Sequence, residues 1–87
     1  MSAAVTMYGT RFCPYCVRAR QLLERKGVAF TEIDVGGRAQ LLREMVQRSG
    51  RHTVPQIWVG ATHVGGYEDL ARLEMQGGLD KLLEPAC

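Results

Sequence analysis

The sequence predicts an α/β domain in which a βαβ unit is followed by a ββα unit, forming a four-stranded mixed sheet flanked by helices. Strand-like runs at 5–8 and 28–35 enclose a helical pattern that starts at Pro14. These two strands should therefore be parallel and joined by a right-handed crossover. Gly60-Ala61 fits a tight hairpin turn, which predicts an antiparallel pair. Leucines at helical spacing from Leu70 onward predict the closing helical segment.

Two helices are predicted before the hairpin. The first runs from about Pro14 to Lys26, because Gly27 suits the left-handed position just past a helix end. The second runs from about Ala39 to Arg48 and ends at Ser49-Gly50. Their inward positions recur every three or four residues: Cys16, Ala19, Leu22 and Leu23 in the first helix, and Leu41, Leu42, Met45 and Val46 in the second.

The later elements are predicted in the same way. The third and fourth strands are expected at 56–59 and 62–64, and the final helical segment is broken at Gly77-Gly78. Other conspicuous side chains are interpreted as packing or surface residues: Met45, Met75, Trp58 and Phe30 in the core, and His52 and His63 on the surface.

Length and composition limit the class of protein. A chain of 87 residues is expected to form a single domain over 1–87. Hydrophobic residues at 46% and charged residues at 23% are typical of globular proteins. The basic residues are dispersed and the net charge is only +2, so we expect no nucleic-acid partner. Neither a signal peptide nor an apolar run of about 20 residues is seen, so we expect no membrane partner and a reducing, cytoplasmic location.

Two cysteines in CxxC spacing, Cys13 and Cys16, stand where the loop after the first strand passes into the first helix. Pro14 is well tolerated in a first helical turn, which places Cys13 at the helix N-terminus. Free N–H groups and the positive end of the helix dipole stabilise a thiolate there, and Arg11 and Arg18 could add positive charge. Because the thiolate is the reactive form, the motif predicts redox chemistry. CxxC beside a βαβ unit is typical of thioredoxin-like proteins.

Other interpretations of the cysteines are weaker. A structural zinc site needs about four ligands, and the remaining candidates, His52, His63 and Cys87, are scattered without a second paired spacing. A structural disulfide across so short a loop would constrain the unfolded chain little. Cys87 is the last residue and is interpreted as a terminal thiol without a redox role.

Three motifs together resemble the glutaredoxin family: Cys13-Pro14-Tyr15-Cys16, Thr53-Val54-Pro55 and Gly65-Gly66-Tyr67-Glu68-Asp69-Leu70. The similarity extends over 5–83 and is strongest to the small bacterial dithiol type. The resemblance implies a thioredoxin-like fold and a glutathione-dependent oxidoreductase. It also implies catalysis by Cys13 and Cys16, with glutathione as co-substrate and no bound cofactor or metal.

The segment before the third strand has two interpretations from sequence. Proline is the residue for which cis peptides are common, but a trans Pro55 starting an edge strand is equally compatible. In the glutaredoxins this bond is cis, which implies that Val54 pairs through its backbone with the cysteine unit of glutathione, as an added strand would. The resemblance thus assigns Thr53, Val54 and Pro55 to glutathione binding. Phe12 and Tyr15, which flank the cysteines, are expected to line the same groove.

The resemblance also implies a place for the γ-glutamyl end of glutathione. Gly65-Gly66 lets the backbone approach closely, and the helix after it begins with free N–H groups that can hold a carboxylate. Family members use an acidic side chain for the ammonium, a role that falls to Asp69, with Glu68 beside it and Gly66 in the backbone contact. Complementing the helix dipole is a second, compatible role for both acids.

Two positions depart from the family pattern. Thr10 occupies the place of a lysine that commonly meets the glycine carboxylate of glutathione, so Arg11 or Arg51 is expected to supply the charge. Tyr67 stands where cysteine is frequent. It removes one thiol and adds bulk beside the groove.

The predicted activity is reduction of protein–glutathione mixed disulfides and of protein disulfides by a monomer. Its partners are glutathione and glutathionylated or disulfide-containing proteins, with a ribonucleotide reductase among the candidates. The alternative is a dimer that holds a [2Fe–2S] cluster through Cys13 and glutathione. Pro14 and the retained Cys16 argue against this alternative, because cluster-binding glutaredoxins usually lack that proline.

Overall fold

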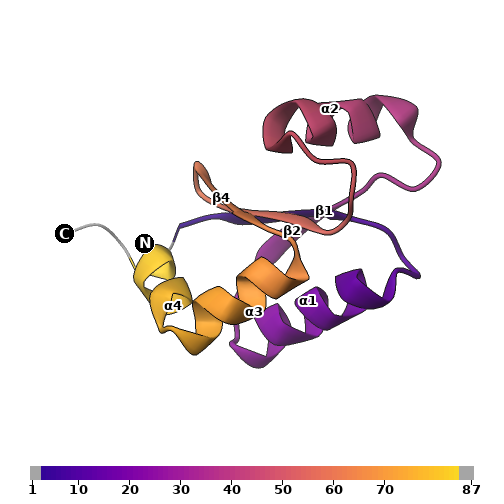
Figure 1. Cartoon of the computed structure of the whole chain (residues 1–87). Coiled ribbons are helices and arrows are strands. Elements are labelled where there is room, and N and C mark those ends of the chain that lie inside the picture. The colour runs from indigo at the N-terminus through magenta and orange to yellow at the C-terminus, as the bar shows by residue number, and fades with distance from the viewer. Residues whose placement is uncertain (1–2, 85–87) are drawn as a thin grey trace.

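Four strands form one mixed sheet in the order β2-β1-β3-β4 (Figure 1). The first strand, β1 (Val5–Gly9), pairs parallel with β2 (Phe30–Asp34) and antiparallel with β3 (Gln56–Val59). The last strand, β4 (Thr62–Gly65), pairs antiparallel with β3. The order and directions of the strands confirm the thioredoxin-like α/β fold predicted from the sequence, with its βαβ unit followed by a ββα unit.

The structure is a computed structural model that describes residues 3–84. Its helices are α1 (Pro14–Arg25), α2 (Ala39–Ser49), α3 (Tyr67–Met75) and α4 (Gly78–Leu83). Figure 1 shows α2 on one face of the sheet and the other three helices on the opposite face. Within the described part of the chain, no helix is long and apolar enough to cross a bilayer.

The sheet separates two apolar clusters, because successive side chains along a strand point to opposite faces. The cluster beneath α1, α3 and α4 contains Val5, Met7, Ala19, Leu22, Leu23, Ile57, Val59, Leu70 and Leu79. The cluster beneath α2 contains Tyr8, Val35, Met45 and Trp58. All four inward positions predicted for the first helix are buried, including Cys16.

The apolar pattern of α2 predicts more burial than the structure shows. Met45 is fully buried and Leu41 and Val46 are partly buried, but the side chain of Leu42 is 38% exposed. The expectation for Leu42 is therefore wrong. Among the helices of residues 3–84, α2 is alone on its face of the sheet, so only the narrow stripe that touches the sheet is covered.

Met75 is a second correction. The helical spacing predicts it in the core, but it is 88% exposed at the end of α3. The chain turns directly after it at Gly77, whose φ of 75° lies in the left-handed region, and enters α4. The helical spacing of apolar residues continues to Met75, the last residue of α3, but no neighbouring element covers that side chain. Element ends also differ by one or two residues: α1 ends at Arg25, and β2 is shorter than the predicted 28–35.

A bulge in the β3–β4 pair determines where α3 begins. The register passes from Trp58 opposite His63 to Ile57 opposite Gly65, which leaves Val64 as an extra residue. Such bulges bend a strand and change the direction in which the chain leaves it. The chain then passes through Gly66, the N-cap of α3, and brings the start of that helix to the edge of the site.

Candidate functional site

Cys13 lies at the N-cap of α1, immediately before Pro14, as the sequence predicted. Its carbonyl accepts the Val17 N–H at 3.0 Å, which closes the first turn of the helix. The thiol is partly exposed and lies 3.9 Å from the carbonyl oxygen of Val54. The cis Val54–Pro55 bond expected from the resemblance is present.

Cys16 lies one turn further into α1, and its side chain is completely buried. Its sulfur accepts the Thr10 N–H at 3.5 Å. A Cβ at Gly9 would lie only 3.0 Å from this sulfur, so glycine leaves room for it. Both cysteines are free thiols. The pair therefore consists of one accessible and one sheltered thiol in the reduced state.

The surroundings push the pKa values of the two thiols in opposite directions. Partial burial alone would raise the pKa of Cys13, but hydrogen bonds from the Cys16 N–H, the Cys16 thiol and the Tyr15 N–H outweigh it and lower that pKa. Burial raises the pKa of Cys16, and the neighbouring Cys13 reinforces the shift. Cys13 is thus the thiol of the pair that ionises more readily, and the thiolate is the reactive form of cysteine.

Alkylation with iodoacetamide should separate the two thiols by pH. Because alkylation depends on the thiolate fraction and the pKa of Cys13 is lowered, Cys13 should reach its half-maximal rate at a lower pH than an ordinary exposed cysteine does. Cys16 should react slowly throughout, because it is buried and its pKa is raised. Peptide mass spectrometry at a series of pH values measures each rate separately. Faster labelling of Cys16 than of Cys13 would contradict the assignment.

Three segments of the chain meet beside Cys13 in a groove of about 340 Å³. The lining residues are Tyr15, Arg51, Thr53, Val54, Pro55, Gly66, Tyr67, Glu68 and Asp69. Val54 connects the groove to the thiol, because its carbonyl is the contact of Cys13. The structure therefore brings together every predicted glutathione-binding residue except Arg11.

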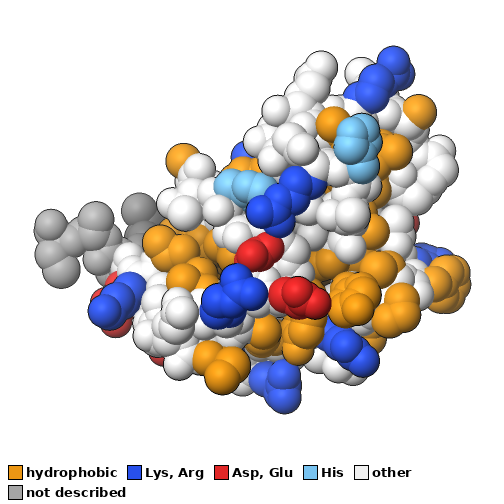
Figure 2. Space-filling model, viewed as in Figure 1, with side chains coloured by type: hydrophobic (Ala, Val, Ile, Leu, Met, Phe, Trp, Pro, Cys, Tyr) orange, Lys and Arg blue, Asp and Glu red, His pale blue; other side chains and the backbone are white. Residues whose placement is uncertain are grey.

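A carboxylate flanked by positive charge lies at the α3 end of the groove. Asp69 Oδ2 accepts the Gly66 N–H at 2.9 Å and an Arg51 Nη1–H at 3.0 Å, and Arg72 Nη1 lies 3.8 Å from Oδ1. The Gly66 hydrogen bond and then Arg51 lower the pKa of Asp69. Figure 2 shows carboxylates between basic side chains over the start of α3. Gly65, with φ of 116°, has no room for a Cβ against this carboxylate.

Arg11 and Phe12 are not among the residues that line this groove. The expectation for Phe12 is therefore wrong, whereas a role for Arg11 in glutathione binding stays a prediction. Arg11 lines a separate hollow with Thr10, Phe12, Asp34 and Gly36. The side chain of Phe12 is 87% exposed. Both residues precede Cys13 in the loop after β1. Sequence proximity to Cys13 thus did not predict a shared surface.

Tyr67 and Tyr15 form an aromatic pair at the edge of the groove. Their ring centroids are 6.4 Å apart and tilted by 34°. The Arg18 guanidinium lies 5.6 Å from the Tyr15 ring centroid. The bulk of Tyr67 therefore lies beside the groove, as predicted, and packs against Tyr15.

Two residues next to the site were missed by sequence reasoning. Gln56 is completely buried at the start of β3, and His63 is partly buried with its ring stacked on Trp58. Burial and the charge of Arg51 lower the pKa of His63. His63 lies at the surface as predicted but is more covered than expected, whereas His52 is exposed as predicted. Over residues 3–84, no group of three or more metal-ligating side chains is gathered.

Comparison with known protein families gives a consistent result. The glutaredoxin family model matches residues 5–64. Glutaredoxin of Pseudomonas aeruginosa is 56% identical over 79 residues, covering 91% of this chain and 94% of that protein. Glutaredoxin 3 of Escherichia coli K12 is 51% identical over 82 residues, covering 94% of this chain and 99% of that protein.

Solved structures agree with the sequence relatives. The solution structure of a glutaredoxin from Brucella melitensis is 51% identical, with a TM-score of 0.83, and covers 94% of this chain and 89% of that one. A dithiolic glutaredoxin from Trypanosoma brucei brucei is 35% identical, with a TM-score of 0.85, over 94% of this chain and 88% of that one. Together with the CxxC dithiol at the start of α1, these matches show that the chain belongs to the glutaredoxin family of glutathione-dependent thiol–disulfide oxidoreductases.

Proposed function

We propose that this protein reduces protein–glutathione mixed disulfides and protein disulfides, with Cys13 as the nucleophile. The Cys13 thiolate attacks the glutathione sulfur of a mixed disulfide, the S–S bond breaks, and the substrate sulfur leaves and takes up a proton. A second glutathione, as thiolate, then attacks the Cys13–glutathione disulfide. Oxidised glutathione leaves and the Cys13 thiolate is restored.

One observation carries this proposal: Cys13, the accessible thiol of the CxxC pair, lies beside the groove. Its pKa is lowered by hydrogen bonds, and its sulfur contacts the Val54 carbonyl that forms one wall. An extended tripeptide pairing with the Val54 backbone would bring its own sulfur next to Cys13. Thiol–disulfide exchange requires that proximity.

The two ends of the groove suggest how glutathione lies in it. The γ-glutamyl end is a zwitterion, and Asp69 and Arg51 form a matching pair of opposite charges 3.0 Å apart. We place the ammonium against Asp69 and the carboxylate against Arg51 and the free N–H groups at the start of α3. This placement revises the sequence interpretation of Arg51, because reaching the glycine carboxylate would require its guanidinium to leave Asp69.

A protein disulfide would be reduced by a second route through the same thiol. Cys13 attacks one sulfur of the substrate disulfide, and Cys16 then attacks Cys13 in the mixed disulfide and releases the reduced protein. Glutathione returns the Cys13–Cys16 disulfide to the dithiol. We infer that one domain does this as a monomer in a reducing cytoplasm, with glutathione as co-substrate and no bound cofactor.

Asp69→Asn should weaken binding of the glutathionyl group and so raise the KM for a glutathionylated peptide. The amide can still accept the Gly66 N–H, so the start of α3 is retained, but the charge that faces the ammonium is lost. A hydrogen bond to a charged group contributes about 1.5–3 kcal/mol, so the KM for a glutathionylated peptide should rise roughly 10- to 100-fold. The measurement is a coupled assay with glutathione, glutathione reductase and NADPH.

Asp80→Asn is the matched control for this variant. Asp80 is also an acid in the first turn of a helix and pairs with Lys26 at 2.8 Å, but it lies outside the groove. The control should keep the wild-type KM. If both variants kept it, Asp69 would have no part in glutathione binding.

A further inference from the structure

A buried amide links the outer strand of the sheet to the glutathione groove. Among residues 3–84, Gln56 is the one polar residue that is completely buried. Its Nε2 donates to the Thr53 carbonyl at 3.0 Å and to Thr53 Oγ1 at 3.3 Å. Its Oε1 lies 2.8 Å from His63 Nε2. Three residues from three successive segments are therefore connected in one chain of hydrogen bonds.

The direction of each hydrogen bond in this chain is determined. A backbone carbonyl can only accept, so the amide nitrogen of Gln56 must face Thr53 and its oxygen must face His63. The oxygen can only accept, so His63 Nε2 must carry the hydrogen. Both amide hydrogens and the amide oxygen of Gln56 are then satisfied. His63 donates to Gln56, and Gln56 donates to Thr53.

The Thr53 carbonyl belongs to the same peptide group as the Val54 N–H. A trans peptide is planar, with its C=O and N–H pointing in opposite directions. The hydrogen bond from Gln56 turns the carbonyl inward, and the Val54 N–H therefore points away from Gln56. Val54 lines the groove and contacts Cys13 through its own carbonyl. The orientation of one carbonyl thus controls the donor offered to a ligand.

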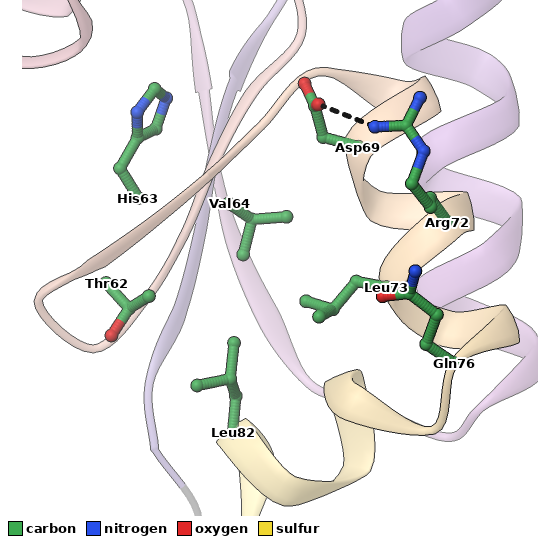
Figure 3. Close-up of a pocket in the computed structure, with 8 residues that line it drawn as sticks. All are labelled: Thr62, His63, Val64, Asp69, Arg72, Leu73, Gln76 and Leu82. Atoms are coloured by element: carbon green, nitrogen blue, oxygen red, sulfur yellow. Dashed lines mark ion pairs between the residues drawn. The ribbon is translucent and has the colours of Figure 1, made fainter.

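The His63 ring is held in place independently of this bond. It stacks on Trp58 with centroids 4.6 Å apart and an interplanar angle of 29°. Its other surroundings are open, because it lines a hollow of about 240 Å³ between β4, α3 and α4 (Figure 3). In that view the Asp69–Arg72 pair lies at one end of the hollow and Leu82 at the other, with Leu73 between them on the α3 side. Trp58 thus holds the ring in place, and His63 contacts Gln56 through Nε2.

We propose that His63 and Gln56 are positioning residues that aim the Val54 N–H into the groove and so determine the affinity for the glutathionyl group. Neither residue lines the groove, so both act through the Thr53–Val54 peptide. This inference rests on the proposed function, because it takes the Val54 backbone as the partner of glutathione.

Two substitutions of His63 separate the hydrogen bond from the stacking. His63→Phe keeps an aromatic ring against Trp58 and removes the donor, whereas His63→Gln keeps a donor and removes the ring. The coupled assay with a glutathionylated peptide gives KM and kcat for each. We expect His63→Phe to raise the KM roughly tenfold, equivalent to about 1.4 kcal/mol, with kcat and the thiol pKa of Cys13 retained. His63→Gln should retain a KM close to that of the wild type.

The opposite pattern, a raised KM in His63→Gln alone, would overturn the proposal, because stacking and not the donor would then matter. Unchanged KM values in both variants would overturn it as well. His52→Leu, a change at an exposed histidine, is the control. If His63→Phe does not fold, Gln56→Met replaces it, because this change keeps the volume and removes the hydrogen bonds of Gln56 to both His63 and Thr53.

The assay also distinguishes this inference from the proposed function. A wild-type protein that shows no saturable turnover of the glutathionylated peptide would refute both. If the wild type saturates and Asp69→Asn raises the KM while His63→Phe does not, glutathione binds in the groove without help from the hydrogen-bond chain. Only the positioning role of His63 and Gln56 would then be lost.

Discussion

Cys13→Ser should abolish reduction of both glutathione mixed disulfides and protein disulfides. A serine hydroxyl does not ionise near neutral pH, so the nucleophile is lost. Cys16 cannot replace it, because its side chain is completely buried and its pKa is raised. Loss of a covalent nucleophile costs several orders of magnitude in other enzymes, so activity should fall by roughly 10³-fold or more.

Both reactions are measured on one preparation of the variant, with its fold checked by circular dichroism. Cys87→Ser is the matched control, because it removes a thiol outside the CxxC pair and should leave both rates unchanged. Substantial turnover by a folded Cys13→Ser protein would transfer the nucleophile to another residue and refute the catalytic assignment.

Cys16→Ser should separate the two reactions. Turnover of mixed disulfides needs only Cys13 and external glutathione, so it should persist, and it should become faster because the Cys13–Cys16 disulfide can no longer form. The serine hydroxyl can still donate to Cys13, which preserves part of the hydrogen bonding that lowers its pKa. Reduction of protein disulfides should fall by about 10²-fold, because an intramolecular attacker with a high effective concentration is lost.

The two rates of the Cys16→Ser protein are compared with those of the wild type under the same glutathione concentration. A fall in both rates, with the fold intact, would mean that Cys16 takes part in every cycle. Unchanged reduction of the protein disulfide would mean that external glutathione, not Cys16, releases that substrate.

The sequence predicted the parts of the fold that depend on local pattern. The helical spacing from Cys16 to Leu23 reflects a face that is buried in the structure, and the glycines at 27, 50 and 60 mark real turns with positive φ. The motifs also identified the groove, because the segments that carry them meet at one end of the strands. Their order in the chain and the βαβ connection determine that meeting.

The features that the sequence did not predict depend on long-range packing. Arg11 and Arg51 were equivalent candidates from sequence, and only the fold shows that they line different hollows. The contact of His63 with Gln56 was not predicted, because the two residues are seven positions apart across a hairpin with a bulge. Met75 and Leu42 show the converse: apolar spacing continues where no neighbouring element covers it.

The most direct test of the central claim is to locate the glutathione on the protein during turnover. The Cys16→Ser protein is mixed with a glutathionylated peptide, quenched in acid and analysed by peptide mass spectrometry. The mechanism predicts one glutathione, attached to Cys13, which disappears when reduced glutathione is added. Glutathione found on Cys87 instead, or none on a variant that still turns over, would contradict nucleophilic attack by Cys13.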